Sequence, residues 1–157
     1  MIKTFLKMIV VFILTFIATS QITHVKAEAP KYNVDEAIEA LHKVEYSEQD
    51  VINLIYLYSE KYGTDRHVIQ QVIYHESHYR TYATGDYNNS FGVCQIFLPS
   101  HPEITKEMAK DPHFCIRFTI ENIMKGQGRM WTGYRLCILN EHIVYEGKVL
   151  RCDKLAN

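Results

Sequence analysis

The chain has 157 residues, of which 47% are hydrophobic and 22% are charged, a composition that excludes an intrinsically disordered protein and suits one globular domain. Its formal net charge is −1, and lysine and arginine form no conspicuous cluster in the sequence. Charge therefore gives no argument for nucleic-acid binding.

Residues 1–27 predict a signal peptide. Two lysines precede an apolar run over residues 8–18, and Val25-Lys26-Ala27 places small or branched residues where a signal peptidase recognises its substrate. The run is shorter than the roughly 20 apolar residues that span a bilayer, so we favour cleavage over retention as a membrane anchor. We expect an exported protein of the periplasm or the extracellular space, with a single domain over residues 28–157.

All four cysteines, Cys94, Cys115, Cys137 and Cys152, lie in the exported part, where an oxidising compartment favours disulfides. Four cysteines allow 3 pairings, and the sequence alone does not choose among them. We favour Cys94–Cys115 with Cys137–Cys152, because the second bond would close a small terminal hairpin. No C-x-x-C pair is present, so we expect no metal site.

Two helices are predicted before residue 64. Residues 34–44 place apolar side chains at the spacing of a short amphipathic helix. Ser47 and Asp50 then stand three apart, as in a capping box, ahead of a longer apolar run. This second helix should end at Gly63, since glycine readily adopts the left-handed conformation that ends helices.

The next helix carries the most informative carboxylate. Thr64 is expected to cap a helix over residues 65–79, and Glu76 lies on its apolar face close to its C-terminus. Desolvation and the negative end of the helix dipole both disfavour a charged carboxylate there, so we expect a raised pKa that suits a proton donor. The alternative interpretation is a structural ion pair with His78 or Arg80.

The second half of the chain predicts shorter elements separated by turns. They are, in order, a loop over residues 81–89, an extended segment over 90–97, a short helix over 103–110, a helix from Asp111-Pro112 to Gly126, a looser segment around Trp131, and a hairpin over 143–150 that turns at Glu146-Gly147. The protein should therefore be mainly helical with a small β element, in the α+β class.

A sequence signature runs through this region: Glu76-Ser77, then Ala83 and Gly85, then Ser90-x-Gly92-x-x-Gln95-Ile96. It resembles the signature of the lysozyme-like superfamily, and is most similar to the soluble lytic transglycosylase group. The resemblance spans residues 65–137, about half of the chain. It implies a lysozyme-like fold in which the small β element lies beside an active-site groove.

The resemblance also implies an activity, the cleavage of the β-1,4 bond between N-acetylmuramic acid and N-acetylglucosamine in peptidoglycan. By position, Glu76 corresponds to the catalytic acid and base of the family. Gln95 and Ser90 would line the floor of the sugar groove, and Tyr134 corresponds to an aromatic residue that approaches the glutamate. Cys94 departs from the bulky apolar residue that the family usually has before the glutamine.

The second carboxylate decides between two reactions. Two-carboxylate glycosidases need a nucleophile or a water activator, and animal-type lysozymes have an aspartate where this chain has Ser90. We therefore expect a transglycosylase, in which Glu76 acts as acid and then as base and the muramic O6 closes a 1,6-anhydro ring. The alternatives are a hydrolase that uses Glu76 with Asp86, a residue otherwise expected to contact substrate, and a non-catalytic glycan-binding protein of the same fold.

No metal or organic cofactor is needed for either reaction. The expected partners are peptidoglycan glycan strands, and members of the group that the chain resembles also serve secretion, conjugation and other envelope assemblies. We expect a monomer that does not bind nucleic acid.

Overall fold

The computed structural model describes residues 32–42, 45–145 and 147–152, all of them within one compact unit that begins at Tyr32. The predicted signal peptide lies outside the described residues. In the described part of the chain, no helix combines the length and the apolar character needed to cross a membrane.

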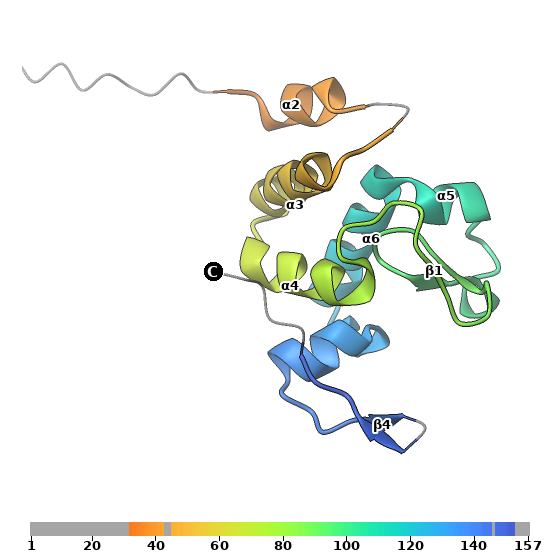
Figure 1. Cartoon of the computed structure of the whole chain (residues 1–157). Coiled ribbons are helices and arrows are strands. Elements are labelled where there is room, and N and C mark those ends of the chain that lie inside the picture. Colours follow the sequence, from red (N-terminus) through yellow and green to blue (C-terminus); the bar gives the residue numbers. More distant parts are fainter. Residues whose placement is uncertain (1–31, 43–44, 146, 153–157) are drawn as a thin grey trace, which may run out of the picture. The chain divides into compact units, whose positions relative to one another are not determined.

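Three helices open the described chain: α2 (Val34–Ala40), α3 (Glu48–Tyr62) and α4 (Arg66–Ser77) (Figure 1). The capping box of α3 is confirmed, because the Ser47 hydroxyl accepts from the Asp50 N–H and the Asp50 carboxylate accepts from the Ser47 N–H. Gly63 ends this helix in the left-handed conformation, with φ of 65°. These local signals were sufficient to fix both ends of α3.

Several predicted helix ends were wrong; the last residue of α4, for example, is Ser77 rather than residue 79. The first helix ends at Ala40 rather than at residue 44. The cap of α4 is Asp65 and not Thr64, since the Asp65 carboxylate accepts a bond of 2.8 Å from the His67 N–H. Either residue type can cap a helix, and an aspartate is in addition favoured by the positive end of the dipole.

The β element is a three-stranded antiparallel sheet in the order β1 (Thr84–Gly85), β2 (Ser90–Phe91) and β3 (Ile96–Phe97). Phe91 pairs with Ile96, and both side chains are buried towards the core. Gly92, with φ of 75°, leaves β2 where a Cβ would overlap the carbonyl oxygen of Ala109. A side chain at position 92 would therefore separate the sheet from the helix that follows it.

The rest of the chain is helical until a terminal hairpin. A 3-10 turn, η1 (Leu98–Ser100), leads to α5 (Lys106–Lys110) and α6 (Pro112–Met124), which share Asp111 as the last cap of one helix and the first cap of the other. The segment expected to be loose forms a 3-10 turn, η2 (Gly128–Met130), and one turn of π-helix, η3 (Tyr134–Ile138). The predicted hairpin is present as β4 (Val144–Tyr145) and β5 (Lys148–Val149).

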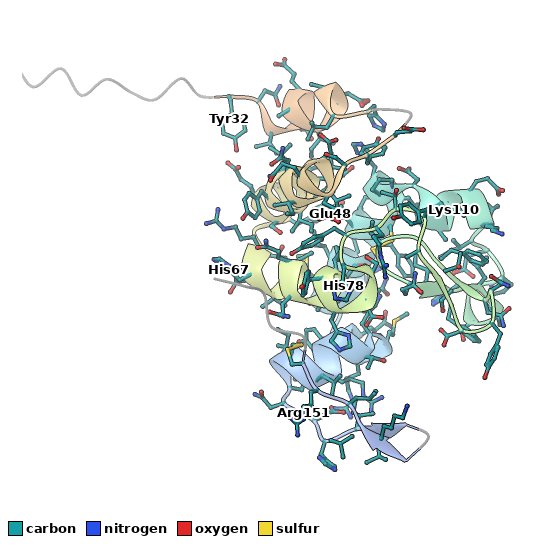
Figure 2. The ribbon with its side chains drawn as sticks, in the orientation of Figure 1. Tyr32, Glu48, His67, His78, Lys110 and Arg151 are labelled. Carbon is teal, nitrogen blue, oxygen red and sulfur yellow. A yellow bond between two sulfur atoms is a disulfide. The ribbon has the colours of Figure 1, made fainter. Side chains whose placement is uncertain are left out.

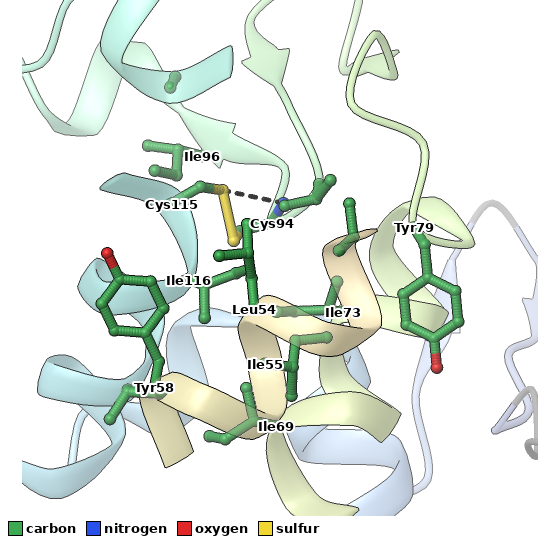
Figure 3. Packing of buried hydrophobic residues seen from close by; sticks show 14 of the residues in the cluster. Leu54, Ile55, Tyr58, Ile69, Ile73, Tyr79, Cys94, Ile96, Cys115 and Ile116 are labelled. Atoms are coloured by element: carbon green, nitrogen blue, oxygen red, sulfur yellow. Dashed lines mark hydrogen bonds between the residues drawn. A yellow bond between two sulfur atoms is a disulfide. The ribbon is translucent and has the colours of Figure 1, made fainter. Parts of the chain in front are cut away.

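The core lies between α3, α4 and α6 (Figure 3). The six largest of its fully buried side chains come from these three helices: Leu54 and Ile55, Ile69 and Ile73, and Ile116 and Ile120. Burying one such side chain stabilises the fold by about 1.5–3 kcal/mol. Because α4 also packs against η3, the core fixes the helix that carries Glu76 against the segment around residue 133.

Both favoured disulfides are present, Cys94–Cys115 and Cys137–Cys152. The first joins the turn before β3 to the first turn of α6, and both of its cysteines are fully buried. The second joins η3 to the chain after the hairpin. The α+β class is likewise confirmed, since the described residues are mainly helical with a small antiparallel sheet.

Candidate functional site

Glu76 occupies the next-to-last position of α4, one residue before the helix ends. His78, labelled in Figure 2, caps the helix in a left-handed conformation with φ of 53°, so that the chain turns away towards the sheet. Glu76 as a whole is half-buried. Its carboxyl group, however, is surrounded densely enough that desolvation is the largest influence on its pKa. This environment raises the pKa of Glu76 to about 7.

The carboxylate is bonded to backbone rather than to a cation. Gly133 N–H donates to Glu76 Oε1 at 2.8 Å, and the N–H of Thr132 is close enough to lower the pKa of Glu76 as well. None of the groups that shift this pKa is a cation, and the Arg80 guanidinium donates instead to the carbonyl of Ser77. The alternative interpretation of Glu76 as a member of an ion pair therefore finds no support among the described residues.

Gly133 has to be a glycine for this bond to form. A Cβ at this position would lie 2.9 Å from the Cβ of His75 and 3.0 Å from the carbonyl oxygen of Val72, both on α4. Because glycine has no Cβ, the backbone at Gly133 can approach α4 closely enough for its N–H to reach Glu76.

Asp86 is the second carboxylate of the site. It lies in the turn between β1 and β2, where three successive residues, Asp86, Tyr87 and Asn88, have positive φ of 47°, 54° and 66°. Its negative charge raises the pKa of Glu76, although less than desolvation does. The fold thus brings Asp86 close enough to Glu76 for the two carboxylates to interact electrostatically.

Ser90 and Gln95 are organised around this turn. Ser90 is buried, and its hydroxyl donates to the carboxylate of Asp86. Gln95 adopts a positive φ of 49°, donates from Nε2 to the carbonyl of Gly92 at 2.9 Å, and lays its amide oxygen over Gly85, where a Cβ would be 2.5 Å away. The hydroxyl of Ser90 therefore orients Asp86, and Gly85 leaves the space that Gln95 occupies.

A pocket of about 350 Å³ opens beside Gln95. Its walls are mainly aromatic and apolar, with contributions from Phe97, Phe118, Met130 and Trp131 and with Ser100 and His101 as polar groups. The Trp131 indole N–H donates to the carbonyl of Cys94 at 2.9 Å, so the wall and the turn that carries Gln95 are bonded to each other. A pocket of this kind suits a ligand with an apolar face and a few polar groups.

Tyr134 begins η3 directly after Gly133, and its ring packs against Gly128, where a Cβ would lie 2.7 Å from the ring. The group of this segment that bonds Glu76 is the backbone N–H of Gly133, the residue before Tyr134. A larger pocket of about 800 Å³, between Tyr46, Tyr82 and Lys110, contains none of the predicted site residues. In the ranges that the structure describes, no group of three or more metal-ligating side chains could hold an ion.

Comparison with protein-family models, with curated proteins and with solved structures found no match for this chain.

Sequence reasoning missed Gly133 and Thr132. Their N–H groups act through the backbone, which residue type does not disclose, and Gly133 is 57 positions from Glu76 in the sequence. The available signal was a glycine directly before the tyrosine that the family resemblance had already placed near the glutamate.

Proposed function

We propose that the protein is an exported peptidoglycan lytic transglycosylase with a lysozyme-like arrangement of the helices around Glu76. The observation that carries the proposal is one carboxyl group, desolvated to a pKa of about 7 and held by backbone N–H groups without a paired cation. A carboxyl with a pKa near neutrality gives up and takes back a proton with similar ease, as a group that serves as acid and then as base must do.

In the proposed reaction, protonated Glu76 donates its proton to the glycosidic oxygen as the bond from that oxygen to C1 of muramic acid breaks. The acetamido group of the substrate stabilises the positive charge that develops at C1. The Glu76 carboxylate then takes the proton from the muramic O6 hydroxyl, and O6 bonds to C1 to close the 1,6-anhydro ring. Glu76 ends the cycle protonated, and no water is consumed.

The pocket beside Gln95, whose lining residues do not include Glu76, supports a saccharide substrate. The pocket beside Gln95 offers the aromatic side chains of Phe97 and Trp131, and sugar rings present apolar faces that pack on such surfaces. The two disulfides suit an oxidising compartment, which agrees with export. Glycan strands of the cell wall, within or apart from an envelope assembly, are the proposed partner.

The test is an analysis of the products released from purified peptidoglycan. The proposal expects 1,6-anhydro-muropeptides, and it expects Glu76→Gln to lose about 10²–10⁴-fold of the rate. Glu121→Gln is the matched control, because Glu121 is a carboxylate on α6 that bonds Tyr62 and lies within reach of Arg117, outside the site. If Glu76→Gln releases fragments at the wild-type rate, the assignment of Glu76 is wrong. If the wild type binds glycan strands and releases nothing, the protein is a glycan-binding protein.

A lysozyme-type hydrolase is the second candidate, and the electrostatic coupling of Asp86 to Glu76 is the observation that favours it. In that reaction Asp86 would activate a water molecule and the products would end in reducing muramic acid. Asp86→Asn separates the candidates, since it would abolish hydrolysis and leave anhydro-ring formation in place.

A further inference from the structure

The N–H groups that bind Glu76 belong to a short segment between two structural turns. Thr132 and Gly133 follow η2 and are themselves helical, so that they run directly into η3 and place their N–H groups at the start of this helical stretch. On one side α4 limits its movement, because even a Cβ added at Gly133 would lie only 2.9 Å from the Cβ of His75. A further set of side-chain contacts joins the residues on either side of Thr132 and Gly133.

Glu141 provides such a contact at both ends of the segment. Its Oε1 lies 2.6 Å from Nη1 of Arg129 in η2, as an ion pair rather than an aligned hydrogen bond, and its Oε2 accepts from Nε of Arg135 in η3 at 2.8 Å. The Glu141 N–H also donates to the carbonyl of Arg135 at 2.9 Å. One carboxylate thus links Arg129, two residues before the Trp131–Gly133 stretch, to Arg135, two residues after it.

The carboxylate of Glu141 is less exposed to solvent than a typical surface ion-pair partner. Only 20% of the Glu141 side chain is exposed, compared with 65% for Arg129 and 37% for Arg135. Ion pairs gain strength with exclusion of water, and a carboxylate that accepts from two guanidinium groups restrains both of them. The Cys137–Cys152 disulfide ties the same π-helical turn to the chain that follows Glu141.

We infer that Glu141 is a positioning residue for Glu76, acting through Arg129 and Arg135 to keep the N–H groups of Thr132 and Gly133 aimed at the Glu76 carboxylate. The inference rests on the proposed function only for its effect on rate. The effect of Glu141 on the position of Thr132 and Gly133 can be tested without any activity, because it concerns the geometry of the backbone.

The expected consequence follows from the groups that surround Glu76. Desolvation and the charge of Asp86 raise the pKa of Glu76, and the N–H groups of Gly133 and Thr132 lower it. His75, which precedes Glu76 on α4, and Tyr134 are the other titratable groups beside this bond. Releasing the segment weakens the two lowering contributions and leaves the raising ones in place, so the pKa of Glu76 should rise further.

The experiment compares the full exported chain with Glu141→Gln, which removes the charge and keeps the shape. Carbon NMR of labelled Glu76 follows its titration, and the nitrogen–proton spectrum follows the amide of Gly133. We expect a higher pKa for Glu76, a shifted Gly133 amide and, on peptidoglycan, kcat lowered about 10-fold at unchanged KM with the alkaline limb moved to higher pH. Glu121→Gln is the control carboxylate and should leave all four readouts unchanged.

An unchanged Glu76 titration and an unchanged Gly133 amide in Glu141→Gln would overturn the inference, whatever the activity. A shifted titration in a protein that degrades no peptidoglycan would uphold the inference and defeat the proposed function. If Glu141→Gln does not fold, Arg129→Gln carries the same test, because it removes one arm of the bridge at a more exposed side chain.

Discussion

Replacing Glu76 by glutamine should stabilise the protein at neutral and alkaline pH while it abolishes the proposed activity. The pKa of Glu76 rises from its ordinary value of 4.5 to about 7, chiefly because the carboxyl group is desolvated. A rise of this size corresponds to about 3 kcal/mol of preference for the protonated form in the folded state. Glutamine is a neutral residue of the same shape and avoids that cost.

The sign of the pH dependence follows from proton binding. Between about pH 4.5 and pH 7 the folded protein holds the Glu76 proton and the unfolded chain does not. The contribution of Glu76 to stability is therefore most favourable below pH 4.5, falls as the pH rises towards 7 and is constant above. Glu76→Gln should lack this decline.

The assay is urea unfolding of both proteins with their disulfides intact, at pH 4.5 and at pH 8, near the ends of this range. The variant should exceed the wild type by up to about 3 kcal/mol at pH 8 and match it closely at pH 4.5. Other groups titrate in both proteins and cancel in the difference. A difference that is the same at both pH values would refute the reasoning, because it would show that the Glu76 carboxyl is not desolvated.

Three further predictions concern the neighbours of Glu76. Asp86→Asn removes a negative charge, so the pKa of Glu76 should fall and the alkaline limb of the pH–rate profile should move to lower pH; a limb that stays in place would contradict the coupling. Gly133→Ala places a Cβ against α4 and should cost about 1–3 kcal/mol in thermal unfolding, together with the bond to Glu76; a wild-type melting temperature would argue against the close approach. Replacing Cys94 and Cys115 together by alanine opens a loop with a sequence separation of 21 and should cost about 3 kcal/mol in urea unfolding, and a loss below about 1 kcal/mol would contradict the predicted stabilisation by this bond.

The parts of the fold that follow local rules could be predicted from the sequence. Ser47, Asp50 and Gly63 define α3 because capping depends on residues a few positions apart. Asp111 and Pro112 start α6 for the same reason. The carboxylate of Glu76 could also be placed, since helical periodicity puts it on the apolar face.

The parts that depend on distant contacts could not be predicted. One local choice was missed as well: Asp65 rather than Thr64 caps α4, because both residue types are good caps and the sequence gives no strong preference between them. The π-helical turn at Tyr134 forms where the chain packs against α4, and nothing in its periodicity distinguishes it from a loop. The bond from the Gly133 N–H to Glu76 could not be predicted either, because its two partners lie on different helices and 57 positions apart in the sequence.

The bond from the Trp131 indole to the carbonyl of Cys94 makes intrinsic tryptophan fluorescence a probe of this region. Trp131 is the only tryptophan in the chain, its ring is buried, and it is bonded to the residue that forms the Cys94–Cys115 disulfide and precedes Gln95. Its emission therefore reports on a single place, the wall of the pocket beside Gln95. Titrating glycan fragments into the unlabelled protein while recording that emission would measure occupancy of this pocket directly, in the catalytically silent Glu76→Gln protein as well as in the wild type.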